Sequence, residues 1–160
     1  MDSPQAILAA KLVSIPLAFT ATGYGLCASH NIVPRLYSEP VGIATSLFAH
    51  VFRIGGSIVV PAALTSVLAS AYLAYYVPAQ RRLWTIAAVS TLVTLPWTRT
   101  VMIPGINRLI AISVDSALQT KSEANGEHVA LLKAWVSQNY IRTFAFFTGG
   151  FAGLLASLTA

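Results

Sequence analysis

Charge is scarce in this chain of 160 residues: only 9% of them are charged, with five Asp and Glu against ten Lys and Arg. A soluble globular domain carries about 25% charge, so the chain lacks the residues that a water-facing surface needs. The shortage excludes an ordinary cytosolic enzyme and a disordered segment. The net charge of +5 forms no basic stripe interleaved with aromatics, so nucleic acid is not an expected partner.

Cysteine and histidine are also rare. The single cysteine, Cys27, excludes an intrachain disulfide and a cysteine zinc site. The three histidines, His30, His50 and His128, show no H-x-H or H-x-x-x-H spacing. We therefore expect no metal cofactor, with copper, zinc or iron held by these imidazoles as a minor alternative.

Apolar residues make up 56% of the chain and occur in long runs. A hydrocarbon core of about 30 Å is crossed by about 20 helical residues. We predict an all-α fold: one transmembrane domain over residues 1–160, folded as an integral membrane four-helix bundle in the lipid bilayer. The predicted spans are approximately 5–29, 54–77, 83–103 and 131–159.

Two of these spans carry expected irregularities. The apolar run 41–77 is too long for one straight crossing, so we expect residues 40–53 to form a leading segment at the interface, with a bend near Gly55 and Gly56 or at Pro61. Pro96 and Pro104 should kink the third span. A helical apolar pattern over 106–119 predicts an extra loop helix.

The chain ends should share one side of the membrane with the turn at Arg81 and Arg82. The 30–39 and 105–130 loops should share the other side, where Arg35, Arg108, Lys121 and Lys133 lie. By the positive-inside rule these two groups of basic residues favour opposite orientations. The larger count favours both termini in the lumen, and the expected membrane is the endoplasmic reticulum.

Polar side chains gather at one pole of the predicted bundle. His50 and Arg53 are spaced i, i+3 and so share a helix face. Trp135, Asn139 and Arg142 are spaced i, i+4, i+7 and share another. No carboxylate lies within the spans to neutralise these arginines, and a guanidinium in a membrane faces a cavity, water or the interface. The pattern predicts a cationic pocket that attracts an anion, or a group that becomes one.

The same residues could instead have purely structural roles. Arg53 and Arg142 could snorkel to lipid headgroups, and Arg99 could be an interfacial anchor. Asn107 and Asn139 could hydrogen-bond between helices, and the aromatic residues could belong to an interfacial belt.

Several elements resemble the anthrone oxygenase-like family of four-span membrane proteins, which are common in fungal polyketide biosynthesis. They are Gly23, Tyr24 and Gly25 followed by Pro34; Gly55; the segment MIPGINRL at 102–109; and the segment WVSQNYIR at 135–142. The resemblance covers nearly the whole chain. It implies oxidation of an aromatic polyketide anthrone to an anthraquinone, with dioxygen as co-substrate and no organic cofactor. It also implies that Asn107, Trp135, Asn139 and Arg142 line the pocket.

The chemistry of anthrone oxidation suggests a role for each polar residue at this pole of the bundle. Loss of a methylene proton gives an electron-rich enolate, so a base, a cation and a dry aromatic slot are needed. His50 is the expected base, and Arg53 and Arg142 would stabilise the enolate. The predicted catalytic residues are His50, Arg53, Asn139 and Arg142. The predicted residues that bind the hydrophobic aromatic substrate are His30, Trp97, Arg99, Asn107, Trp135 and Tyr140.

Two other functions remain alternatives. The same side chains would suit a non-oxidative membrane cyclase or isomerase of a biosynthetic intermediate. A structural or accessory membrane protein is the other alternative. The oligomeric state is left open.

Overall fold

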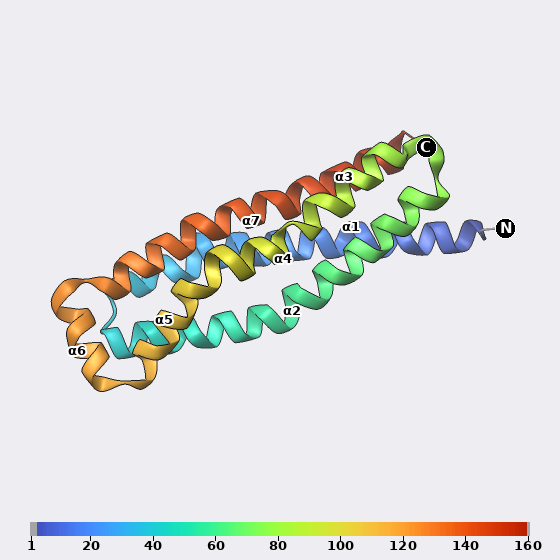
Figure 1. Ribbon diagram of the computed structural model, residues 1–160. Helices are drawn as coiled ribbons and strands as arrows, with labels where there is room; N and C mark the ends of the chain where they lie inside the picture. Colours follow the sequence, from blue (N-terminus) through green and yellow to red (C-terminus); the bar gives the residue numbers. More distant parts are fainter. Residues whose placement is uncertain (1–2, 160) are drawn as a thin grey trace.

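Four long helical segments lie side by side in an elongated bundle (Figure 1) in the computed structural model, which describes residues 3–159. These residues contain no strand, so the predicted all-α fold is confirmed. The helices are α1 (Pro4–Cys27), α2 (Val41–Tyr76), α3 (Arg81–Leu92), α4 (Thr94–Trp97), α5 (Ile103–Val114), α6 (Ser116–Asn125) and α7 (Glu127–Leu158). Short π or 3-10 turns join them: η1 (Ala28–Ile32), η2 (Val33–Ser38), η3 (Pro78–Gln80) and η4 (Thr98–Met102).

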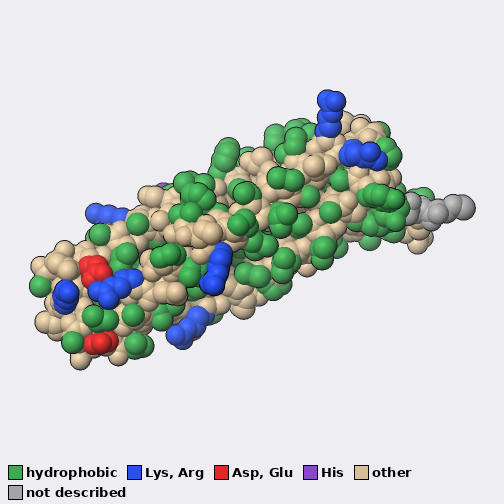
Figure 2. Space-filling view, viewed as in Figure 1, with side chains coloured by type: hydrophobic (Ala, Val, Ile, Leu, Met, Phe, Trp, Pro, Cys, Tyr) green, Lys and Arg blue, Asp and Glu red, His purple; other side chains and the backbone are tan. Residues whose placement is uncertain are grey.

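The bundle has the dimensions and surface of an integral membrane protein. Four segments are long and apolar enough to cross a bilayer: Pro4–Ser38, Val41–Tyr76, Pro78–Val114 and Glu127–Leu158. Apolar side chains are spread along the surface of the bundle (Figure 2). Among the large exposed ones, Leu68 and Phe144 are 71% and 70% exposed. Such a surface is stable in lipid and unstable in water. The endoplasmic reticulum as the membrane in question stays a prediction.

The charges divide the bundle into a belt and a head. On α2 no charged residue lies between Arg53 and Tyr76, and on α7 none lies between Arg142 and Leu158. At 1.5 Å per residue these stretches measure about 34 and 24 Å, which matches a core of about 30 Å. We call this charge-free part the belt. The other end, which we call the head, comprises η1, η2, α5, α6 and the first turns of α2 and α7.

The carboxylates of the described chain all lie in the head, and Figure 2 shows acidic side chains gathered at the end that carries α6. They are Glu39, Asp115, Glu123 and Glu127. The ion pair in the described chain joins Arg108 Nε to Glu127 Oε1 at 2.7 Å. The arginines at the border of the belt are thus separated along the bundle from most of the acidic charge.

The head has its own apolar core, which holds the beginning of the second span. Ala44 and Phe48 are fully buried there, packed with Met102, Leu109 and Leu132. The first turns of α2 are held in this core, outside the belt, and their place at the membrane interface stays a prediction. The helix is not interrupted at the sites of the expected bend, since α2 runs as one helix of 36 residues, about 54 Å long.

The kinked third span is confirmed. The α-helical pattern breaks after Leu92 and passes through α4 and the π turn η4 before α5. Pro96 cannot donate a backbone hydrogen bond, and threonine hydroxyls satisfy carbonyls near the break. Thr98 Oγ1 donates to Thr94 O at 2.7 Å, and Thr100 Oγ1 donates to Pro96 O at 2.8 Å. An irregular helix in a membrane needs such partners. The extra loop helix predicted over 106–119 is also present, mostly as α5, which ends at Val114, with α6 following from Ser116.

Buried serines join α1 to α2 within the belt. The Ser14 and Ser70 hydroxyl oxygens lie 2.6 Å apart, and Ser66 Oγ donates to Ser14 O at 2.9 Å. Small polar residues let two helices approach closely in a bilayer. Both ends of the described chain lie at the end of the bundle where α3 begins (Figure 1). Which side of the membrane they occupy stays a prediction.

Candidate functional site

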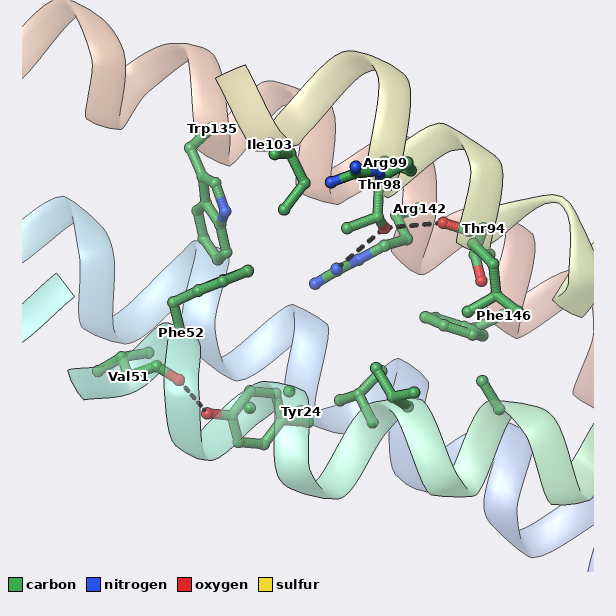
Figure 3. Close-up of a pocket in the computed structure, with 16 residues that line it drawn as sticks. Tyr24, Val51, Phe52, Thr94, Thr98, Arg99, Ile103, Trp135, Arg142 and Phe146 are labelled. Carbon is green, nitrogen blue, oxygen red and sulfur yellow. Dashed lines mark hydrogen bonds between the residues drawn. The ribbon is translucent and has the colours of Figure 1, made fainter. Parts of the chain in front are cut away.

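A cavity of about 210 Å³ lies inside the bundle at the border between head and belt. Figure 3 shows it enclosed by α2 on one side and by α7 with the α4–η4 segment on the other. Most of its wall is apolar, with Phe52, Val59, Ala63 and Phe146 among the lining residues. A pocket of this kind favours an apolar or aromatic ligand, with the few polar groups fixing its orientation.

Arg142 brings a positive charge into this cavity without a counter-ion. Its Nη2 donates to Asn139 Oδ1, and its Nη1 donates to Thr98 Oγ1 at 3.3 Å. Both partners are neutral. A charged side chain placed within a membrane protein costs about 2.5–3.5 kcal/mol even on insertion scales, so an unneutralised guanidinium favours a ligand that carries or develops negative charge.

Asn139 holds this arginine in place. Its Nδ2 donates to Gly25 O at 3.0 Å and to Ser29 Oγ at 2.7 Å, and the residue is completely buried. Two fixed acceptors on α1 and η1 orient the amide so that its oxygen faces Arg142. Asn139 is therefore a positioning residue behind the cavity wall.

Two buried N–H groups that belong to the lining residues have no partner in the described chain. They are Nε of Arg142 and Nε1 of Trp135. Figure 3 shows both side chains reaching into the same space. Buried donors are nearly always hydrogen-bonded, and neither group can accept a bond. The cavity wall thus contains two buried donors that have no acceptor in the described chain.

Tyr24 forms part of the wall and was not predicted as a site residue. Its hydroxyl donates to Val51 O at 3.0 Å (Figure 3). Its ring lies against Gly55, where an added Cβ would come within 2.7 Å of Cε1. Both residues belong to the motifs that carry the family resemblance, which was the available signal. Phe52, Thr98 and Phe146 were also missed, because only the folded bundle brings them to the cavity.

The structure brings some predicted residues together. Trp135, Arg99 and Arg142 line the cavity, and Asn139 supports it from behind. Trp97 does not line it: its Nε1 donates to Gln138 O at 3.2 Å, and its ring packs against the head core.

His50 and Arg53 are not brought to the cavity. Both are exposed on the outer side of α2. From this helix the cavity is lined by Phe52, Gly55, Gly56 and Val60 among others, but not by His50 or Arg53. His50 lies about 200° around the helix from Phe52, whereas Arg53 shares a face with Gly56 and Val60 at i+3 and i+7. The expectation that these two residues face the enclosed space is corrected, because both side chains are exposed on the outside of the bundle.

The remaining predicted residues also lie elsewhere. Asn107 and His30 are exposed on the head, and Tyr140, 39% exposed, borders a shallow groove between α1 and α7. His128 is buried, and its backbone N–H donates to Ser122 Oγ at 2.9 Å. In residues 3–159 no three His, Cys, Asp or Glu side chains group as metal ligands would.

The chemistry of the cavity follows from its composition. Its lining residues with ionisable side chains are Tyr24, Arg99 and Arg142, and none is a carboxylate, imidazole, lysine or thiol. Such a site is suited to binding a flat apolar molecule and to stabilising an oxyanion that forms on it.

Comparison with known proteins gives a family. The family model described as "Anthrone oxygenase" matches residues 48–152, which are 105 of the 160 residues. The match contains most of α2, the whole third span and the part of α7 that carries Trp135, Asn139 and Arg142. No curated protein and no solved structure matches. The match covers well over half of the chain, and the protein is thus a member of the anthrone oxygenase family.

Proposed function

We propose that the protein is a membrane-embedded oxygenase of secondary metabolism that converts an aromatic polyketide anthrone into an anthraquinone. The observation that carries this proposal is the Arg142 guanidinium, which has only neutral partners, in an apolar cavity that Trp135 also lines. In this reaction the methylene carbon loses two hydrogens and gains one oxygen atom from dioxygen. The second oxygen atom leaves as water.

The first step is ionisation of the substrate. The methylene carbon loses a proton, and the resulting negative charge is delocalised onto the carbonyl oxygen as an enolate. The Arg142 guanidinium lines the cavity, so its positive charge stabilises this oxygen where the negative charge develops, while Trp135 forms part of the wall. The cavity lining offers no imidazole or carboxylate. We therefore assign the proton to water at the edge of the cavity marked by Arg99.

The second step is oxygen transfer. The enolate gives one electron to dioxygen, and the two radicals combine to form a carbon–oxygen bond at the former methylene carbon. The peroxide formed in this way takes back the first proton from water. The carbon then loses its second hydrogen as a proton while the O–O bond breaks and hydroxide leaves. The proton and hydroxide form water, and the new carbonyl completes the quinone. Apolar walls such as Phe52 and Phe146 keep bulk water away from the intermediate.

Oxygen uptake by the purified protein in liposomes tests the proposal. Anthrone is supplied as substrate, protein-free liposomes give the rate of autoxidation, and labelled dioxygen should place one oxygen atom in the quinone. We expect Arg142→Gln to lower the enzymatic rate by about 10²-fold or more. Arg82→Gln, an exposed arginine at the opposite end of the bundle, serves as the matched control.

The same experiment separates the alternatives. A rearranged product without oxygen uptake would indicate the cyclase or isomerase. Absence of any product, with a partner protein co-purifying, would indicate the accessory protein. Equal elution profiles and thermal unfolding in detergent show that both variants fold like the wild type.

A further inference from the structure

We propose that the opening of the cavity between α2 and the α4–η4 segment is a lateral portal, through which a neutral apolar aromatic molecule enters from the hydrocarbon core of the bilayer. The identity of that molecule as an anthrone rests on the proposed function. The route of entry rests on the geometry of the opening.

The lining residues divide into a buried back wall and a more exposed rim. Gly55, Val59 and Ala63 on α2 are buried. On the same helix Val60, which is 44% exposed, lies at the rim one turn after Gly56. Across the opening, Leu95 and the exposed Arg99 are again one turn apart. Two i, i+4 pairs on facing helices thus frame the opening.

The surface around the rim faces lipid. Val60 lies seven residues beyond Arg53, so it is about 10 Å inside the charge-free belt. Leu64, one turn further along the same face of α2, is 45% exposed, and Leu92 before α4 is 47% exposed. An apolar rim with apolar surroundings at this depth opens into acyl chains rather than into water.

The rim is polar at one edge only. Arg99 lies one turn closer to the head than Leu95, at the border of the belt. Such a rim orients a molecule that has an apolar ring system and oxygen atoms along one edge. The rings stay in the hydrocarbon core while the oxygens contact the Arg99 guanidinium. The molecule would enter with its oxygens already directed toward Arg142 and Trp135.

Gly56 sets the free width of the portal. A Cβ built there meets no atom within 4 Å, so the space in front of the residue is open. The same is true of Gly23 on α1, which does not line the cavity. Phenylalanine at position 56 would therefore obstruct the portal without a backbone clash, and phenylalanine at position 23 is the matched control.

A photoprobe dissolved in the bilayer tests the route without requiring turnover. The probe is 3-(trifluoromethyl)-3-phenyldiazirine, a small apolar aromatic, added to liposomes that contain the protein. Trp135 and Phe146 are only 5% and 2% exposed and line the cavity, whereas Phe144 is 70% exposed to the lipid. Labelling of the two buried residues, divided by labelling of Phe144, measures entry of the probe into the cavity.

We expect the wild type and Gly23→Phe to be labelled at Trp135 and Phe146, with anthracene competing for this labelling. Gly56→Phe should reduce the ratio about tenfold, which corresponds to about 1.4 kcal/mol, while Phe144 stays labelled. Absence of cavity labelling in the wild type, or equal ratios in Gly56→Phe and Gly23→Phe, would overturn the portal. Lack of oxygen uptake with intact cavity labelling would instead count against the oxygenase alone.

Discussion

Asn139 and Arg142 lie one turn apart on α7, and the amide oxygen of the first accepts a hydrogen bond from the guanidinium of the second. The amide nitrogen of the same asparagine is bound to Gly25 O on α1 and to Ser29 Oγ on η1. The position of the cation in the cavity therefore depends on the packing of α1 against α7. Gly25 makes that packing possible, because a Cβ there would overlap the Thr143 hydroxyl.

A built-in counter-ion should slow the reaction strongly. Thr98 Oγ1 accepts a hydrogen bond from Arg142 Nη1, so a carboxylate in Thr98→Asp would lie beside the guanidinium and neutralise it. The cavity would then no longer attract an enolate. We expect the rate of anthrone oxidation to fall by about 10²-fold or more, measured by oxygen uptake in liposomes.

Thr98→Asn is the control for this change. It has the same shape as Asp, keeps an oxygen that can accept from Arg142 and adds no charge. We expect it to keep the rate within about tenfold of the wild type, since a neutral hydrogen bond contributes about 0.5–1.5 kcal/mol. Equal loss in the Asp and Asn variants would show that the charge of Arg142 is not what the reaction uses.

The shape of the guanidinium should matter as well as its charge. Arg142→Lys keeps a cation but removes Nε, the donor that has no partner in the described chain. An ammonium at this position cannot keep the hydrogen bonds to Asn139 and Thr98 and also reach a ligand oxygen with the same geometry. We expect kcat to fall by roughly 10²-fold, with a smaller change in KM. A lysine variant with wild-type kcat would mean that a point charge is sufficient.

Much of the fold could be predicted from local sequence, because each span is an apolar run of the length that a bilayer requires. The grouping of Trp135, Asn139 and Arg142 was predictable for a similar reason, since their spacing fixes one face of one helix. Spacing also placed His50 and Arg53 on a common face. The spacing alone does not determine which neighbouring helix that face contacts. In the bundle, both side chains are exposed on the outside.

Tyr24 and Gly55 illustrate what local sequence cannot show. Their contact joins α1 to α2, and it depends on how closely these two helices approach. Likewise, the uninterrupted course of α2 depends on the head core around Phe48, which forms only when segments distant in sequence meet. Gly55 and Gly56 look equivalent as a pair of bend sites, yet one is pressed against a ring and the other faces open space.

Removal of the predicted base should leave the reaction intact. His50 is exposed on α2 and does not line the cavity, so His50→Ala should oxidise anthrone at a rate close to that of the wild type. A surface substitution of this kind changes stability by about 0.5 kcal/mol or less. Oxygen uptake across a pH series is the measurement. A large loss of rate in His50→Ala, rescued by added imidazole, would return the role of base to this histidine.

The two adjacent glycines of α2 should respond oppositely to the same methyl group. In Gly55→Ala the new Cβ would lie 2.7 Å from Tyr24 Cε1, and this ring is tethered by its hydrogen bond to Val51 O. We expect overpacking to destabilise the bundle by about 1–3 kcal/mol. In Gly56→Ala the methyl group meets nothing within 4 Å, so the helix should gain about 0.5–1 kcal/mol. Unfolding of both variants in detergent, followed by circular dichroism, measures the difference. Equal stabilities would show that Tyr24 does not pack on Gly55 and that the cavity wall on this side is built differently.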